Sequence, residues 1–387
     1  MTKTHHHTLS EVIFFSYGDS NKASTWSNVP YLFSKHIEKR GIAVRRINLD
    51  VLPLIWKVLD HTLLKLIQVF FPCPGFSFGR TNIWLCLEER IIKKALMEYP
   101  NADLCIFTCY EHYNRYNDIP ALLFSDWSYK ILVEEKQKRK PFFFEKSFYD
   151  HQETVINNAE YVVCLFSNYA EIMRKDYPQA NIHFLGGNVI NSFYSENVSG
   201  EFIIPFKKKN RVLFVGKKYY KEGLLILIEA FKELRNVIKD AELHVIGMTS
   251  EQAGTNEDFI QFHGYLKKDD EIENKVYYDL LKTSGVVVNT TPNWGGYSSI
   301  IEAMFFYTPV LVTPFASFVD EFGKTIDFGK YVPDLGAKQI SSQLISILQS
   351  REYDELCKAA HERVKDYTWD SYLDRMFALV TDDKTIC

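Results

Sequence analysis

The chain has 387 residues, of which 46% are hydrophobic and 24% charged, and its length predicts two domains. This composition excludes a disordered or low-complexity chain. Forty-five basic and 49 acidic residues leave a net charge of −4, which argues against a nucleic-acid partner. The seven cysteines form no CxxC pair, so we expect a reduced, cytoplasmic protein without a structural zinc site.

The sequence contains no predicted membrane-spanning helix and no predicted signal peptide. The most apolar run, Leu63–Phe71, has nine residues and includes Lys65 and Gln68, which is too short to cross a bilayer. The first apolar run, Val12–Tyr17, is too short for the apolar region of a signal peptide.

In the first half of the chain, short apolar runs alternate with helical patterns. The predicted strands are Val12–Tyr17, Ala43–Leu49, Asp103–Cys109, Ala121–Phe124, Tyr161–Phe166 and Ile182–Leu185. The predicted helices are Asn28–Arg40, which Gly41 ends, Thr81–Glu98 and Tyr149–Asn158. This alternation is typical of a parallel sheet covered by helices on both faces.

A segment that mixes Asn, Ser, Gly and Pro, Asn188–Asn210, predicts an interdomain linker. A second alternation follows, with strands at Val212–Val215, Leu243–Ile246, Ile260–Phe262, Val286–Asn289 and Val310–Val312 and helices at Gly223–Asn236, Asn274–Ser284 and Ser299–Tyr307. The sequence therefore predicts two doubly wound, Rossmann-like α/β domains in tandem. Ligands of such sheets bind beyond the carboxyl ends of the strands, here facing an interdomain cleft.

The loop before the predicted helix at Ser299 has the features of an anion site. The backbone amides that would face a phosphate, at the positive end of the helix dipole, belong to Gly295, Gly296, Ser298 and Ser299. Glu302 would accept hydrogen bonds from the vicinal hydroxyls of a ribose. Alternatively, Ser299 and Glu302 have the spacing of a capping box, in which case Glu302 only closes the helix N-terminus.

A second loop follows the predicted strand Val212–Val215 and carries a glycine and three lysines. Lys217, Lys218 and Lys221 precede Gly223. Lysines at the mouth of the cleft would neutralise a diphosphate leaving group without a metal ion. Solvated surface lysines are the alternative interpretation.

Together these stretches resemble the retaining GT-B glycosyltransferases of family four. The motifs that carry the resemblance are Phe214–Lys217 with Gly223, Glu229–Phe231, His244–Gly247, Phe262–Leu266, Ile301–Met304, Thr308–Pro314 and, near the C-terminus, Tyr367–Asp370. The loop that contains Gly18 is similar to the family's first glycine-containing loop. The resemblance implies a GT-B fold, with residues 1–190 as the acceptor domain, 200–367 as the nucleotide-sugar domain and a last helix, 368–387, that returns to the first domain.

The chain departs from the family pattern at two positions. The first of the family's two glutamates falls on Trp294, which bears on sugar choice and on activity. The second residue of the family's basic pair falls on Glu222. The resemblance implies that the donor is bound by Gly18, Lys217, Lys221, Tyr265, Trp294, Gly295, Gly296, Ser298, Ser299 and Glu302.

A histidine of the family's first domain falls near Ser125–Trp127, where Asp126 takes its place. Asp126 would orient a sugar hydroxyl or help the acceptor to lose its proton, unless it is only the N-cap of the next helix. With Lys217 and Lys221 it completes the predicted catalytic set. His112 also follows a predicted strand, and we expect it in a surface loop rather than in the cleft.

Two segments of the first domain suit an anionic membrane surface. Glu135–Lys146 mixes five basic residues with Phe142–Phe144, and Pro53–Pro74 places nine large apolar residues roughly on one helical face. This face either packs on the sheet of the first domain or attaches the protein peripherally to the inner face of the plasma membrane.

The sequence thus predicts a metal-independent, retaining glycosyltransferase with no cofactor other than its nucleotide-sugar co-substrate. The acceptor would be a hydroxyl of a glycan or of a lipid-linked glycan, in surface polysaccharide or glycolipid biosynthesis. The alternative is a catalytically inactive GT-B homologue that binds a nucleotide-sugar or acts as a scaffold subunit, which Trp294 and Glu222 favour.

Overall fold

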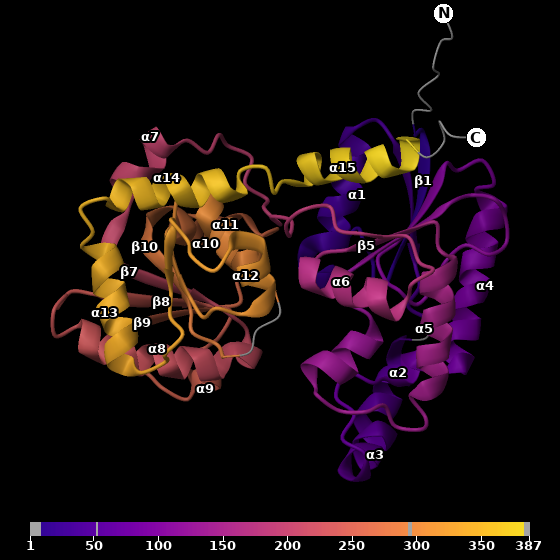
Figure 1. Cartoon of the computed structure of the whole chain (residues 1–387), viewed down its shortest axis with the longest axis horizontal. Coiled ribbons are helices and arrows are strands. Elements are labelled where there is room, and N and C mark those ends of the chain that lie inside the picture. The colour runs from indigo at the N-terminus through magenta and orange to yellow at the C-terminus, as the bar shows by residue number, and fades with distance from the viewer. Residues whose placement is uncertain (1–8, 52, 293–295, 383–387) are drawn as a thin grey trace, which may run out of the picture. The chain divides into compact units, whose positions relative to one another are not determined.

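The computed structural model describes residues 9–51, 53–292 and 296–382, which form two compact units (Figure 1). The first unit contains the described residues up to Gly187 together with those from Trp369 onward, and the second contains Asn188–Thr368. Each unit is built on one six-stranded sheet in which all neighbouring strands are parallel. The prediction of two doubly wound α/β domains is confirmed at this level.

The sheet of the first unit has the strand order β2-β1-β3-β4-β5-β6. Its strands are β1 (Glu11–Ser16), β2 (Ala43–Asn48), β3 (Leu104–Phe107), β4 (Ala121–Ser125), β5 (Tyr161–Cys164) and β6 (Ile182–His183). The chain winds outward in opposite directions from β1, so the boundary between β1 and β3 is the topological switch point, where α/β sheets bind their ligands. All four residues of β3 and of β5 are buried.

Helices cover this sheet and extend beyond it. They are α1 (Val29–Lys39), α2 (Pro53–Leu59), the π-helical turn η2 (Asp60–Leu64), α3 (Lys65–Phe70), α4 (Asn82–Glu98), the π-helical η4 (Ile131–Lys136), α5 (Lys146–Asn158), α6 (Ser167–Asp176) and α15 (Trp369–Asp382), with short 3-10 turns at η1 (Thr25–Asn28) and η3 (Phe78–Arg80). In Figure 1, α15 lies beside α1. The indole of Trp369 stacks on Phe33 of α1, with 4.9 Å between ring centroids, and Arg40 pairs with Asp374 at 2.7 Å.

The segment from α2 to α3 does not pack on the sheet, so that expectation for Pro53–Pro74 is wrong. Leu66 is 66% exposed and Phe70 79%, whereas Leu64 of η2 is buried. In Figure 1, α3 projects from the end of its unit, away from the strands. No helix among the described residues is long and apolar enough to cross a membrane.

The sheet of the second unit has the order β12-β11-β10-β7-β8-β9. Its strands are β7 (Lys208–Val215), β8 (Glu242–Ile246), β9 (Ile260–Gly264), β10 (Ser284–Asn289), β11 (Val310–Val312) and β12 (Gly329–Tyr331). The switch point lies between β7 and β10. The predicted linker is too long: β7 already begins at Lys208, where Ser284 pairs with it, and a short helix, α7 (Gly200–Ile203), lies within the linker range.

The remaining elements of the second unit are helices and short turns. They are η5 (Ile204–Phe206), η6 (Lys218–Tyr220), α8 (Lys221–Leu234), α9 (Ser250–Ala253), α10 (Glu271–Thr283), α11 (Ser298–Phe305), α12 (Ala316–Phe322), α13 (Ala337–Leu348) and α14 (Tyr353–Val364). Leu224, Leu227, Ile228 and Phe231 of α8 recur at helical spacing and are buried in the same apolar cluster as Leu344 of α13. This packing fixes the first turn of α8 at the carboxyl edge of the sheet.

Candidate functional sites

The carboxyl edge of the second sheet is built from closely approaching glycines. Gly216 follows β7, Gly247 follows β8 and Gly264 ends β9. Gly247 N donates to Gly264 O at 2.6 Å, and a Cβ on Gly247, whose φ is +99°, would lie 2.7 Å from Gly216 O. Only glycine fits such a position, so a ligand at this edge meets backbone groups.

Gly223 brings the start of α8 into contact with the chain after β10, across the switch point of the same edge. A Cβ on Gly223 would lie 2.6 Å from the backbone nitrogen of Thr291, and Thr290 Oγ1 donates to Gly223 O at 2.6 Å. The first turn of α8 is therefore fixed against the chain that leaves β10. This contact explains the predicted glycine at the start of the helix.

Of the predicted basic residues, Lys217 lies at this edge beside Tyr265. Lys217 Nζ is 5.1 Å from the centroid of the Tyr265 ring, and both side chains are exposed. Lys221 is the first residue of α8, and its Nζ would lie 3.3 Å from a Cβ on Gly254, after α9. The structure thus brings two of the predicted donor-binding residues together and turns Lys221 toward Gly254.

Glu302 lies in the middle of α11 with its carboxylate buried and bound by three side chains. Oε2 accepts from Lys268 Nζ at 2.5 Å and from the hydroxyl of Tyr277 at 2.8 Å, and Oε1 accepts from the hydroxyl of Tyr278 at 3.3 Å. Lys268 Nζ also donates to the carbonyl of Asn191 at 2.8 Å. Glu302 is therefore the centre of a polar cluster beside the switch point.

The capping-box alternative for Glu302 is wrong. Helix α11 begins at Ser298 with Tyr297 as its N-cap, and no side chain of the described residues caps it. Ser299 consequently lies inside the first turn. The partner that sequence reasoning missed is Lys268, three residues after Tyr265, and the only signal for it was a Lys-Lys pair after a predicted strand.

The predicted anion loop is described only in part. Gly296 precedes α11, and Ser298 and Ser299 form its first turn, where all three are partly buried. Trp294 and Gly295 lie outside the described residues.

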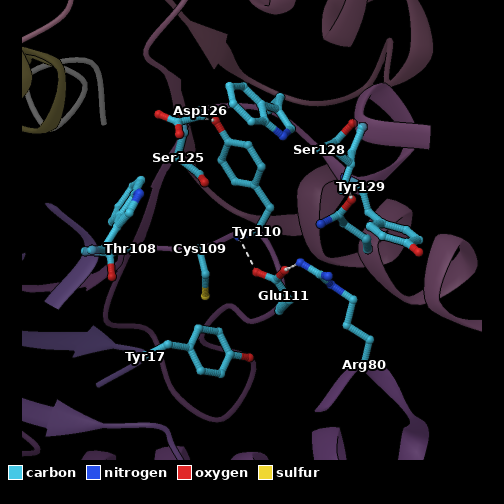
Figure 2. Close-up of a pocket in the computed structure, with 14 residues that line it drawn as sticks. Tyr17, Arg80, Thr108, Cys109, Tyr110, Glu111, Ser125, Asp126, Ser128 and Tyr129 are labelled. Atoms are coloured by element: carbon cyan, nitrogen blue, oxygen red, sulfur yellow. Dashed lines mark hydrogen bonds and ion pairs between the residues drawn. The ribbon is translucent and has the colours of Figure 1, made fainter. Parts of the chain in front are cut away.

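A pocket of about 330 Å³ lies at the carboxyl edge of the first sheet (Figure 2). Most of its lining residues lie at or after the carboxyl ends of β1, β3 and β4, the strands that flank and adjoin the switch point, and η3 and α5 contribute the others. The lining includes Tyr17, Arg80, Thr108, Cys109, Tyr110, Glu111, Ser125, Asp126, Trp127, Ser128, Tyr129 and Gln152. Figure 2 shows Asp126 and Tyr17 at opposite ends of the pocket, with Glu111 facing Arg80 between them. The mixture of aromatic rings, carboxylates and a carboxamide suits a polyhydroxylated ligand.

Asp126 lines this pocket, and the pKa of its carboxyl group is raised. Burial raises its pKa to about 6, and Lys136 offsets the shift only partly. Lys136 Nζ itself lies 4.1 Å from the ring centroid of Trp127. The N-cap alternative for Asp126 is wrong, because Ser128 Oγ accepts the hydrogen bond from Ile131 N at 3.3 Å.

Gly18, the remaining predicted donor residue, also belongs to the first unit. It follows β1 with a φ of +86°, and its backbone nitrogen donates to Asn48 Oδ1 at 3.0 Å. A Cβ on Gly18 would approach Thr25 Cγ2 to 3.0 Å, so the conformation of the loop requires glycine.

His112 is fully buried, so the expectation of a surface loop is wrong. Its Nε2 lies 2.7 Å from Glu88 Oε2 and its Nδ1 lies 3.5 Å from Glu89 Oε1, both on α4. Tyr17 extends this cluster to the pocket, because its hydroxyl donates to Glu88 Oε2 at 2.9 Å. No sequence motif signals the cluster, since its members come from segments far apart in the chain.

The charges of this buried cluster follow from its hydrogen bonds. Burial lowers the pKa of His112, but the bonds to Glu88 and Glu89 outweigh it and raise the pKa to about 9. Burial raises the pKa of Glu88, whereas for Glu89 the bonds from His112 and Tyr116 outweigh burial and lower the pKa. We therefore assign an imidazolium paired with an ionised Glu89 at neutral pH.

Comparison with known proteins identifies the second unit. Residues 209–350 match the model of the family described as glycosyl transferases group 1. These residues form a glycosyltransferase group 1 domain. No curated protein sequence matches the chain significantly. The prediction of a glycosyltransferase is confirmed at the level of this domain.

Solved structures with the same fold cover almost the whole chain. Sucrose-phosphate synthase from Thermosynechococcus elongatus has a TM-score of 0.65 and 15% identity and covers 98% of this chain and 100% of its own. WaaG, a glycosyltransferase involved in lipopolysaccharide biosynthesis, has a TM-score of 0.58 and 15% identity, with 95% and 98% covered. HepE of Anabaena, solved with UDP and glucose, has a TM-score of 0.57 and 12% identity, with 97% and 100% covered. The predicted GT-B fold is confirmed.

Proposed function

We propose that the protein transfers a glycosyl group from a nucleotide-diphosphate sugar to a hydroxyl of a glycan or glycolipid acceptor, with retention of configuration and without a metal ion. The observation that carries this proposal is the group 1 domain at residues 209–350, whose switch point combines backbone amides, an exposed lysine and a helix N-terminus. We place the reaction in the cytoplasm, in surface polysaccharide or glycolipid biosynthesis.

The donor would lie along the glycine edge of the second unit. The amides at Gly296, Ser298 and Ser299 and the ammonium of Lys217 would stabilise the diphosphate as it departs. Lys221 would join them by turning away from Gly254. A diphosphate can approach the backbone of this edge closely, because glycine has no Cβ atom that would separate the two.

Glu302 would hold the ribose through Oε1, whose contact with the hydroxyl of Tyr278 is the longer one at 3.3 Å. Its Oε2 would stay bound to Lys268 and Tyr277, which keep the carboxylate in place. Lys268 is therefore a positioning residue in this proposal. When the ribose binds, its hydroxyls would donate to Glu302 Oε1 in place of the long hydrogen bond from Tyr278.

The acceptor would lie in the pocket of the first unit, with its reacting hydroxyl near Asp126. A carboxyl group whose pKa is about 6 is poised to accept a proton near neutral pH. The aromatic walls formed by Tyr110 and Trp127 would cover the apolar face of a sugar ring. We expect the acceptor to remain in the pocket while the donor sugar is transferred.

Two observations favour the second candidate, a homologue that binds a nucleotide-sugar without transferring it. The ammonium group of Lys268 is already hydrogen-bonded to the carboxylate of Glu302. In addition, the exposed Glu222 lies in the first turn of α8, where the resemblance implies a lysine. Such a protein would bind the nucleotide without turnover.

A binding and turnover screen separates these candidates. Uridine, guanosine and thymidine diphosphate sugars would be tested with the wild type, Lys217→Ala and the matched control Lys239→Ala. We expect one base to raise the melting temperature of the wild type and of the control, with release of diphosphate, and to do neither in Lys217→Ala. Binding without release would support the second candidate, and no binding of any nucleotide would contradict both.

A further inference from the structure

The end of the first unit carries a continuous set of exposed apolar side chains. Between α2 and α3 these are Leu54 (78% exposed), Ile55, Val58, Leu63, Leu66, Val69 (74%), Phe70 (79%) and Phe71. Most of them lie three or four residues from another member along α2, η2 and α3, which places them on a broad common face. Large apolar side chains gathered this densely on a surface mark a docking site.

A second segment lies beside this helical face. The ring of Phe71 is 5.4 Å from that of Phe142 and 6.1 Å from that of Phe143, centroid to centroid. Phe143 is itself 74% exposed. Residues 54–71 and 138–146 therefore form one surface, which we call the basic-apolar tip; α3 is at its end in Figure 1.

The tip is strongly cationic. It contains six Lys or Arg residues and two carboxylates. Both carboxylates have internal partners: Asp60 Oδ1 accepts from the backbone nitrogen of Phe78 at 2.8 Å, and the buried Glu145 pairs with Arg139 at 2.6 Å. Lys65 and Lys140 are exposed and form no ion pair with any described residue. The tip thus offers positive charge that the protein leaves uncompensated.

We infer that the basic-apolar tip inserts into the headgroup region of a membrane that contains anionic lipids. Exposed Leu, Val and Phe side chains next to lysines are the combination that interfacial helices use, with the apolar face in the acyl boundary and the ammonium groups among the headgroups. A second copy of the tip fits poorly, because each tip has a net positive charge, six Lys or Arg residues against two carboxylates, and would face an identical one. The inference rests on the proposed function only in that it would bring the acceptor pocket of the same unit to a lipid-linked acceptor.

The test is flotation of the full chain with vesicles of phosphatidylcholine alone and with one third phosphatidylglycerol. We expect binding to the anionic vesicles only, weakened as salt rises from 0.05 to 0.5 M. Leu66→Ser with Phe70→Ser should lower the binding constant at least tenfold. Lys65→Glu with Lys140→Glu should lower it by about fivefold or more for each lysine.

Matched controls come from the second unit. Val237→Ser with Ile272→Ser removes two exposed apolar side chains, at 56% and 77% exposure, and Lys239→Glu with Lys338→Glu changes two exposed lysines. Both controls should bind like the wild type. Because all eight side chains are exposed, unchanged melting temperatures would show that the variants are folded.

Three outcomes overturn the inference: no binding to anionic vesicles, equal binding by the tip variants, or a dimer in solution that Phe70→Ser dissociates while vesicles bind nothing. Transfer to a soluble acceptor, measured in parallel, separates this inference from the proposed function. Vesicle binding without transfer would leave the tip assignment standing and contradict the proposed function. Transfer without vesicle binding would support the proposed function and contradict the tip assignment.

Discussion

The carboxyl edges of the two sheets are built differently. In the second unit the edge consists of backbone: Gly216, Gly247 and Gly223 bring chain segments into contact, and Lys217 stands exposed above them. In the first unit the edge is a pocket of side chains supported by a buried charged cluster around His112. A backbone site leaves its signature in the order of glycines along the chain, whereas a side-chain pocket is assembled from residues distant in sequence.

This difference explains what the sequence predicts and what it does not. Both bounds of strand β11 are predicted correctly. The glycines after β7 and β8 are visible in the sequence because a Cβ has no room at these positions, so that glycine must occupy them. The partners of Glu302 and the burial of His112 are not predicted, because they depend on which side chains the fold brings together. The family model matches residues 209–350, within the unit whose sheet edge is lined by glycines.

The largest effect on stability should come from the buried cluster of the first unit. His112→Asn removes the imidazolium that lies between Glu88 and Glu89 and leaves Arg115 as the remaining cation beside Glu89, which should lower the free energy of unfolding by about 3 kcal/mol. Urea denaturation measures the change, with the exposed His61→Asn as the control. A loss below about 1 kcal/mol would contradict the assignment of a buried imidazolium at His112.

The same cluster predicts a pH dependence. The pKa of His112 is raised in the folded chain to about 9, so the folded state holds a proton that the unfolded state has released. The stabilisation is therefore complete below about pH 6.5 and is lost as the pH rises toward 9. Wild type should lose stability over this window more steeply than His112→Asn, and parallel curves would contradict the assignment.

In the second unit, the largest effect should come from the polar cluster around Glu302. Glu302→Gln and Lys268→Met should each lower the free energy of unfolding by about 2 kcal/mol, since each removes a buried charged hydrogen-bond partner. The double variant should cost less than the sum, and that coupling is the readout. Purely additive losses would mean that the two side chains do not pair in solution.

The close backbone approach at Gly223 gives a smaller effect. Gly223→Ala should cost about 1–3 kcal/mol, because the new Cβ would displace Thr291. Gly296→Ala is the matched control, since a Cβ there meets no atom of the residues that the structure describes within 4 Å. Thermal unfolding distinguishes the two, and equal melting temperatures would contradict the packing of α8 against β10.

Asp126 should affect stability least, although it should affect activity. Because its pKa is raised to about 6, ionisation costs folding free energy as the pH rises from about 4 to 6, and Asp126→Asn should remove this loss. For transfer, kcat/KM should rise with pH through about 6 in the wild type and lose that rise in Asp126→Asn. A rise kept by the variant would assign the proton transfer to another group.

The most direct test of the account is amide hydrogen exchange of the whole chain with and without uridine diphosphate. We predict added protection in the second unit, at 216–221, 264–268 and 296–302, where the backbone is proposed to hold the diphosphate. Exchange at 108–129, around the pocket of the first unit, should be unchanged. Protection confined to 108–129, or no protection in either unit, would contradict the assignment of the donor to the glycine edge of the second unit.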